Sequence, residues 1–139
     1  MSNIWSSFTE YIINNYSNSK KIVEVGVGRI LEPSNILKET LNSTVINLVD
    51  IHPANDEIIQ EDIYQPTDEI YENANLIYSI RPPEELQEAI VNLGIKYNAI
   101  IIIKPLFTEE INVNLQNKLK LVNYKKTAFY EYKRKKHDK

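Results

Sequence analysis

Two rhythms of hydrophobic residues alternate along this chain. In some stretches apolar residues recur every three or four positions, as in a helix with one buried face. In others Val and Ile form short continuous runs, as in a strand that is buried on both faces. The first rhythm predicts helices over Ser2–Asn15, Pro33–Leu41, Glu84–Leu93 and Asn112–Leu121, with Gly94 as the C-cap of the third and a single helical turn within Pro66–Asn73.

The second rhythm predicts strands over Ile22–Val25, Thr44–Val49, Glu57–Gln60, Asn75–Ile80, Ala99–Ile103 and Val122–Tyr132, the last as a closing strand pair or one long bent strand. Strands that alternate with helices in this way give an α/β fold with a doubly wound, mostly parallel, Rossmann-like sheet and a β-rich C-terminus. We expect one domain over residues 1–139, with an N-terminal helix within 1–18 and a basic tail over 133–139.

The segment Lys21–Ile30 is the most informative about function. An apolar strand meets Gly26 and Gly28 there, and a predicted helix follows at once. This order of strand, glycine turn and helix N-terminus holds nucleotide-like ligands in α/β folds. The third glycine of the dinucleotide fingerprint is absent, so a tight strand–helix turn is the alternative. Glu24 lies inside the strand, where a carboxylate is costly to bury unless it is paired or faces a ligand.

Two acids follow the next two strands. Asp50 ends the second strand about twenty residues after Gly28, where an acid accepts hydrogen bonds from ribose hydroxyls. The alternative is that Asp50 caps the turn before His52. Asp62 follows the third strand. Because the carboxyl ends of parallel strands share one edge of the sheet, both acids are predicted to lie beside the glycine loop.

Three cations are expected at the same edge. Arg29 follows the glycine loop, Arg81 follows the fourth strand just before Pro82, and Lys104 follows the fifth. Arg and Lys bind phosphate and carboxylate groups, so these residues are candidates for contact with an anionic substrate. Each cation alone could equally be a strand-end residue that reaches into water.

Composition narrows the classes of function. The chain has no Cys and only two His, which argues against a thiolate or histidine metal site, and no metal is expected. No apolar run approaches the ~20 residues that cross a bilayer, and the N-terminus does not resemble a signal peptide, so we expect a cytoplasmic protein that does not bind membranes. The net charge of −3 conceals a basic end at residues 118–139, which is either a solvated tail or a contact for RNA.

The sequence resembles class I S-adenosylmethionine-dependent methyltransferases. The matching motifs are E-V-G-V-G at Glu24–Gly28, L-V-D ending at Asp50, E-D-I at Asp62 and S-I-R-P-P at Ser79–Pro83. Together with L-I-Y-S-I-R-P-P-E-E-L-Q and I-I-K-P-L, they are similar to a family of small, functionally uncharacterised archaeal proteins with that fold. The resemblance implies that the cofactor is S-adenosylmethionine. Gly26 and Gly28 would then pass its methionine part, Asp50 would hold its ribose, and Asp62 would lie near its adenine amine, with Glu24 also counted among the cofactor-binding residues.

The resemblance leaves three functions open. The first is a small methyltransferase in which Arg81 and Lys104 orient an anionic substrate. Many amino- and base-methylating enzymes have an acid or Asn before the two prolines, where this chain has Arg81. The second is therefore a non-catalytic module that acts through a protein or RNA partner. The third is a binder of NAD or another nucleotide, in which Arg29 meets a phosphate at a helix N-terminus.

Overall fold

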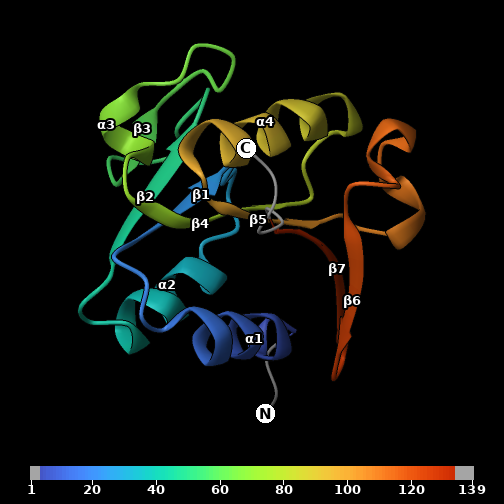
Figure 1. Ribbon diagram of the computed structural model, residues 1–139. Helices are drawn as coiled ribbons and strands as arrows, with labels where there is room; N and C mark the ends of the chain where they lie inside the picture. Colours follow the sequence, from blue (N-terminus) through green and yellow to red (C-terminus); the bar gives the residue numbers. More distant parts are fainter. Residues whose placement is uncertain (1–3, 134–139) are drawn as a thin grey trace.

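The computed structural model describes residues 4–133 and contains one seven-stranded sheet of order β3-β2-β1-β4-β5-β7-β6 (Figure 1). Its strands are β1 (Lys21–Val25), β2 (Val45–Asp50), β3 (Ile58–Gln60), β4 (Ala74–Ile80), β5 (Ile100–Lys104), β6 (Lys120–Tyr124) and β7 (Thr127–Tyr132). Its α-helices are α1 (Ser6–Tyr16), α2 (Glu32–Thr40), α3 (Asp68–Tyr71) and α4 (Gln87–Tyr97). Strands β1 to β5 pair in parallel, whereas β7 is antiparallel to both β5 and β6. The predicted doubly wound, mostly parallel sheet is confirmed, and the β-rich C-terminus is a strand pair.

Strand β1 lies at the point where the order of the sheet reverses. It pairs with β2 on one side and with β4 on the other, and the chain continues to β3 beyond β2 and to β5 beyond β4. The loops after β1 and β4 therefore diverge at the carboxyl edge of the sheet. In open α/β sheets this divergence opens the crevice in which ligands bind.

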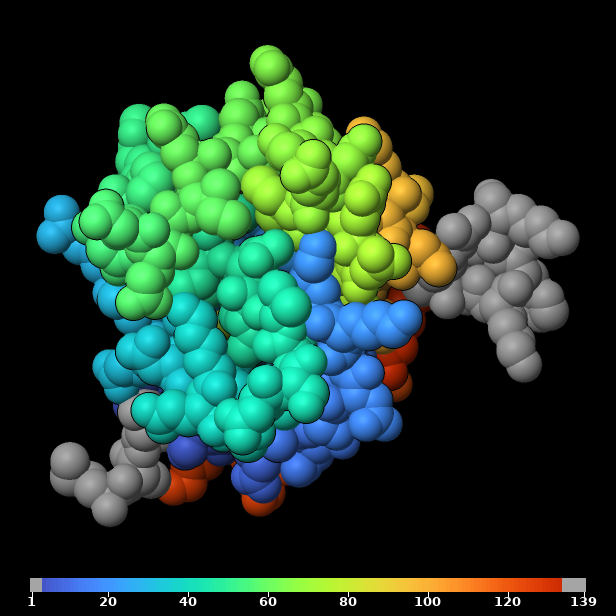
Figure 2. Space-filling model, turned by 90° about the vertical axis from the view of Figure 1, so that its left-hand side faces the viewer, coloured from blue at the N-terminus to red at the C-terminus, as the bar shows by residue number. Residues whose placement is uncertain are grey.

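The sheet separates two hydrophobic cores, because successive side chains of a buried strand point to opposite faces. Helices α1 and α2 cover one face and α3 and α4 cover the other (Figure 1). Val23 and Val25 of β1 join the α3/α4 core, and Ile22 joins the α1/α2 core. The view in Figure 2 shows that the blue, cyan and green N-terminal half of the chain forms most of one side of the molecule.

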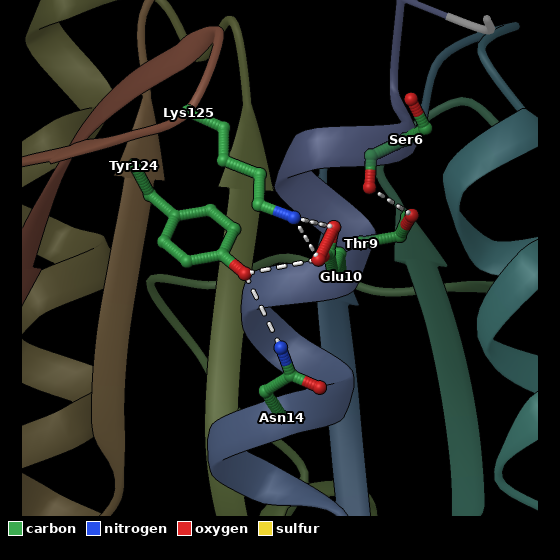
Figure 3. Close-up of polar contacts among 6 residues, drawn as sticks. All are labelled: Ser6, Thr9, Glu10, Asn14, Tyr124 and Lys125. Atoms are coloured by element: carbon green, nitrogen blue, oxygen red, sulfur yellow. Dashed lines mark hydrogen bonds and ion pairs between the residues drawn. The ribbon is translucent and has the colours of Figure 1, made fainter.

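Helix α1 is tied to the turn between β6 and β7 (Figure 3). The Nζ of Lys125 lies 2.9 Å from Oε2 of Glu10, and the hydroxyl of Tyr124 donates to Oε1 of the same carboxylate at 3.1 Å. Asn14, one turn further along α1, donates to the hydroxyl of Tyr124 at 3.2 Å. The Lys125 hydrogen bond holds the pKa of Glu10 below its ordinary value. These contacts connect the first helix of the chain to its last strand pair.

A second polar link lies deeper between α1 and β7. The buried carboxylate of Glu131 accepts hydrogen bonds from the hydroxyls of Tyr11 and Tyr16. Burial and the Glu131 charge raise the pKa of Tyr11 to about 12, so the phenol stays a donor at neutral pH. The carboxylate is therefore compensated by two neutral donors and by the ammonium of Lys133, whose Nζ lies 3.6 Å from Oε1. A charged residue can stay inside the strand pair for this reason.

The main differences from the sequence prediction at the helix boundaries are in α1 and α4. Helix α1 begins at Ser6, and the predicted start at Ser2 lies outside the described residues. A 3₁₀ turn over Glu84–Leu86 precedes α4. The prediction that Gly94 is a C-cap is wrong, because α4 continues to Tyr97 and Asn98 takes the left-handed C-cap conformation with φ of 57°. Asn tolerates that conformation better than most residues do.

Position 94 requires a glycine because α4 packs closely on β5 there. A Cβ at this position would lie 2.4 Å from Cγ1 of Ile101 and 2.9 Å from the carbonyl oxygen of Ala99. We expect Gly94→Ala to destabilise the protein by about 1–2 kcal/mol, since overpacking costs more than the better helix propensity of Ala returns. Urea unfolding measures the change. Asn92→Ala, at an exposed position of the same helix, is the control and should change stability by less than about 0.5 kcal/mol.

The predicted helix over Asn112–Leu121 is wrong. The segment forms 3₁₀ turns over Thr108–Glu110 and Val113–Leu115 before β6 begins. Ile111, Leu115 and Leu119 are all buried at a spacing of four, which imitates a helical stripe. Side chains take the place of helical hydrogen bonds, because Gln87 accepts from the backbone N–H of Asn112 at 2.7 Å and donates to the carbonyl of Glu110 at 2.9 Å.

Candidate functional site

The glycine loop connects β1 to α2 at the reversal point of the sheet. Gly26 and Gly28 have φ of 68° and 58°, a conformation that strains residues with a Cβ. The N–H of Gly26 donates to the carbonyl of Val49 at 2.9 Å, and the N–H of Gly28 donates to Oδ2 of Asp50 at 2.8 Å. The loop is therefore fixed to the end of β2 by its backbone, and both glycines are exposed.

Asp50 connects two loops. Its Oδ2 accepts from the glycine loop, and its Oδ1 accepts from the N–H of His52 at 2.8 Å, which forms the turn that the alternative interpretation predicted. The carboxylate is half-buried at the end of β2. Each carboxylate oxygen has a second lone pair, so Asp50 retains the capacity to accept two more hydrogen bonds from a ligand.

A pocket of about 480 Å³ opens beside these residues at the carboxyl ends of β1, β2 and β3. It has a size typical of small-molecule sites. The pocket is lined by Val25, Gly26, Val49, Asp50, Ile51, Glu61, Asp62, Ile63, Tyr64, Pro83 and Leu86. The structure thus brings Gly26, Asp50 and Asp62 together in the pocket wall. Gly28 does not line the pocket, but its N–H donates a hydrogen bond to Asp50. Apolar side chains form most of the remaining wall.

Glu61 is a pocket residue that the sequence analysis did not identify. Its carboxylate is 7% exposed and accepts from the N–H and the hydroxyl of Thr67 at 2.8 and 3.0 Å. The N–H of Glu61 donates to the carbonyl of Asp50 at 3.0 Å, which carries the pairing of β2 and β3 one step further. Glu61 and Asp62 together follow the third predicted strand, which is the signal in the sequence for both acids. Asp62 itself accepts from the N–H of Tyr64 at 2.9 Å.

Glu24 lies outside this pocket, on the α1/α2 face of β1. It is 1% exposed, and its Oε1 accepts from the hydroxyl of Tyr78 at 2.7 Å. Its Oε2 is buried and has no hydrogen-bond partner among the described residues. Burial raises the pKa of Glu24 to about 8 despite the Tyr78 hydrogen bond. The side chain is therefore mostly a neutral carboxylic acid at pH 7.

The three cations do not meet in the pocket. Arg29 is exposed beyond the glycine loop, and Pro82 lies beside the lining residue Pro83 without joining the lining. Arg81 and Lys104 lie together at the ends of β4 and β5, where the N–H of Arg81 donates to the carbonyl of Lys104 at 2.7 Å. The guanidinium carbon of Arg81 lies 5.5 Å from the ring centroid of Trp5, a residue of the α1/α2 core.

Residues 4–133 contain neither a metal-binding cluster nor a membrane-spanning helix. No group of three or more His, Cys, Asp or Glu in this range could hold a metal ion. No helix in the same range has the length and apolar character needed to cross a membrane. The predicted basic tail lies outside the described residues except for Lys133, whose Nζ is 3.6 Å from Oε1 of Glu131.

Comparison with known families adds the evolutionary context of this pocket. Residues 5–134 match the model of Uncharacterised protein family (UPF0146). The chain belongs to this family. It is 40% identical to the UPF0146 protein of Methanothermobacter thermautotrophicus over 129 residues, which cover 93% of this chain and 95% of that one. It is 35% identical to the UPF0146 protein of Archaeoglobus fulgidus over 131 residues, with the same two coverages.

Solved structures with a similar fold include methyltransferases. The UPF0146 chain superposes on the S-adenosyl-L-methionine methyl transferase from Silicibacter pomeroyi with a TM-score of 0.58 and 15% identity, over 93% of this chain and 91% of that one. It superposes on a putative methyltransferase from Thermoplasma acidophilum with a TM-score of 0.58, also at 15% identity, over 85% and 70% of the two chains. The fold of this UPF0146 protein is therefore that of S-adenosylmethionine-dependent methyltransferases.

Proposed function

We propose that this UPF0146 protein binds S-adenosylmethionine in the pocket beside the glycine loop and uses it to methylate a small molecule. The observation that carries the proposal is the charge of the pocket. Among the described residues that line it, Asp50, Glu61 and Asp62 are acids and none is Lys or Arg. Such a wall suits a ligand with hydroxyl donors, an amine and a positive sulfonium. It repels the diphosphate of NAD.

The lining residues fit the parts of this cofactor. Asp50 has free lone pairs for ribose hydroxyls, and the exposed glycines permit close approach of a chain that carries an amino acid group. Ile51, Ile63 and Leu86 offer an apolar wall for a flat base, and Asp62 can accept from its amino group. Tyr64 is exposed at the same margin, where its ring can cover the base.

When bound, S-adenosylmethionine supplies a methyl group that is made electrophilic by a positively charged sulfur. The residues of this chain contribute by position, because holding two reactants in line accelerates a reaction without a dedicated base. Pro83 lines the pocket just after the end of β4, and we expect the second reactant to bind at this edge of the sheet. The acceptor would form a bond to the methyl carbon as the carbon–sulfur bond breaks, S-adenosylhomocysteine would be the leaving group, and the acceptor's proton would pass to solvent.

One observation favours a second function, which is binding without methyl transfer. Arg81 occupies the position before the two prolines, and a guanidinium can donate hydrogen bonds but cannot accept one from a target amine. An amine substrate would have no side-chain acceptor at this position. A non-catalytic module acting through a protein partner or RNA would need none.

The test of the proposal is isothermal titration of the purified protein with S-adenosylhomocysteine, with NAD as the matched competitor. We expect micromolar binding of S-adenosylhomocysteine and at least tenfold weaker binding of NAD, because the acidic lining disfavours phosphate. Folded protein that binds neither ligand, or NAD more tightly, would contradict the proposal. Incubation with methyl-labelled S-adenosylmethionine and pools of small acids then separates methyl transfer from binding alone.

A further inference from the structure

Arg81 has an unusual backbone conformation. Its φ is 54°, in the left-handed region that non-glycine residues seldom adopt. Pro82 and Pro83 follow it, and its own N–H is held by the carbonyl of Lys104. Backbone strain of this kind persists only where surrounding contacts enforce it, and it concentrates at functional sites. The strain here fixes the direction in which the Arg81 side chain leaves β4.

That direction places the Arg81 guanidinium over an aromatic ring, and the backbone N–H of Arg81 pairs it with Lys104 of the next strand. The guanidinium of Arg81 lies over Trp5, and the half-buried Lys104 extends from β5 on the same face of the sheet. The Nζ of Lys104 donates to the carbonyl of Ala128 at 3.1 Å, which uses one of its three hydrogens. Burial and the nearby Arg81 charge lower the pKa of Lys104. Two positive groups are thus held close although they repel each other.

No acid compensates this pair within the described part of the chain. The ion pairs there involve Lys38, Lys96, Lys125 and Lys133, and neither Arg81 nor Lys104 takes part in one. Elsewhere in the protein a charged group that is withdrawn from water has partners, as Glu131 has Tyr11 and Tyr16. Lys104 is half-buried without a counter-ion and lies beside the exposed Arg81, which is costly, and an external anion would remove that cost.

We propose that Arg81 and Lys104 form a binding site for the oxyanion group of a small methyl acceptor, either a carboxylate or a phosphate. The role in methyl transfer rests on the proposed function above, whereas the anion binding itself does not. A planar guanidinium engages two oxygens of such a group at once, and the ammonium adds a compact charge beside it. Trp5 holds the guanidinium plane in place through a cation–π contact.

The position of this anion site matches a role beside the cofactor pocket. Arg81 and Pro83 belong to the same short segment, and Pro83 lines the pocket while Arg81 turns to the α1/α2 face. Ile63 and Leu86, which also line the pocket, pack on the α3/α4 face. An acceptor that is anchored by its anionic end at Arg81 therefore reaches the pocket across the end of β4. A small molecule suits this site better than RNA, since RNA binding relies on many exposed phosphate contacts.

The experiment uses Trp5, the only tryptophan in the chain, as the reporter. The emission of Trp5 is followed in the cofactor-free protein during titration with sodium phosphate and, separately, sodium malonate, with sodium chloride at equal ionic strength as the reference. We expect a saturable change with a millimolar midpoint for at least one of the two anions. Arg81→Gln should abolish it, and Lys104→Gln should raise the midpoint at least fivefold.

Lys96→Gln is the matched control, because Lys96 is also an exposed cation over an aromatic ring, 5.4 Å from the centroid of Tyr97. It should leave the titration unchanged. Thermal unfolding of each variant checks that it is folded, and Lys104→Gln tests the site separately should Arg81→Gln unfold. A signal that follows chloride equally, or that survives both substitutions, would overturn the proposal. A third outcome is that neither small anion has an effect, whereas single-stranded RNA binds with a steep salt dependence. The ligand of this site would then be RNA, and the proposal of a small acceptor would be overturned.

The same variants separate this inference from the proposed function. We expect Arg81→Gln to bind S-adenosylhomocysteine as the unmodified protein does, since Arg81 does not line the pocket. Anion binding without cofactor binding would refute the proposed function and leave the anion site standing. Cofactor binding without anion binding would refute the anion site and leave the proposed function standing.

Discussion

Asp50→Ala is expected to weaken the binding of S-adenosylhomocysteine by about 100-fold, measured by isothermal titration at neutral pH. The substitution removes an acceptor for two ribose hydroxyls, and each hydrogen bond to a charged group contributes about 1.5–3 kcal/mol. The lower figure for both bonds together already corresponds to about two orders of magnitude in Kd. Asp56→Ala, at an exposed acid in the loop after β2, is the control for a loss of negative charge and should leave the affinity within about threefold.

A loss of affinity alone would have two explanations, because Asp50 also holds the glycine loop through the N–H of Gly28. A 2′,3′-dideoxy analogue of S-adenosylhomocysteine distinguishes them. If Asp50 binds the ribose, the unmodified protein prefers the hydroxylated ligand strongly and Asp50→Ala loses that preference. An unchanged preference in the variant would mean that Asp50 only supports the loop.

Glu24→Gln is expected to remove a pH dependence from the stability of the protein. The pKa of Glu24 is about 8 in the folded state and 4.5 without the effects of folding, so the folded protein retains a proton that the unfolded chain releases between these values. The stability therefore falls as pH rises from about 5 to 8, by up to about 1.4 kcal/mol per pH unit, and it levels off above pH 8. Gln is neutral throughout and keeps an oxygen that accepts from Tyr78.

Urea unfolding at pH 5, 6.5 and 8 measures this effect. The variant and the unmodified protein should be similar at pH 5, and at pH 8 the variant should be more stable by a few kcal/mol. Glu39→Gln, at an exposed position of α2, makes the same chemical change without burial and is the control. Parallel stability curves for Glu24→Gln and the unmodified protein would show that Glu24 is ionised in the folded state. Glu24 would then need a cation or donor that the described contacts do not include.

The two acids of the motif E-V-G-V-G…D have different surroundings. Glu24 is buried under α1 and α2 with one donor, whereas Asp50 is half-buried and accepts two backbone N–H groups. Burial raises the pKa of Glu24, so we expect it to pack against Tyr78 as a neutral acid at neutral pH. Asp50 lines the pocket, where a ligand can reach it.

The sequence by itself determined the sheet and the acids at its edge. The apolar runs predicted the five parallel strands. Strands β1, β4 and β5 are buried on both faces, which requires continuous apolar residues, whereas β2 and β3 are partly exposed. The positions of Gly26, Asp50 and Asp62 after three of these strands predicted that they would lie together, and all three line one pocket. This inference needs only the rule that parallel strands end at a common edge, so no knowledge of distant contacts was required.

Tertiary structure decided the features that depend on contacts between distant segments. Ile111, Leu115 and Leu119 have helical spacing, yet Gln87 from another element satisfies the backbone there and the helix does not form. Position 94 requires a glycine because Ile101 leaves no room for a Cβ, and not because a helix ends there. A local pattern records which residues are buried but not which neighbour buries them, and the neighbour sets the outcome.

The same reason explains the separation of the cations from the acids. Arg81 and Lys104 follow β4 and β5, and the sequence placed them at the edge where the acids lie. Whether their side chains join the pocket depends on the face to which each is turned. The left-handed φ of Arg81, the ring of Trp5 and the carbonyl of Ala128 turn them to the α1/α2 face. These contacts join residues that are far apart in the chain, and only the folded structure brings them within reach of one another.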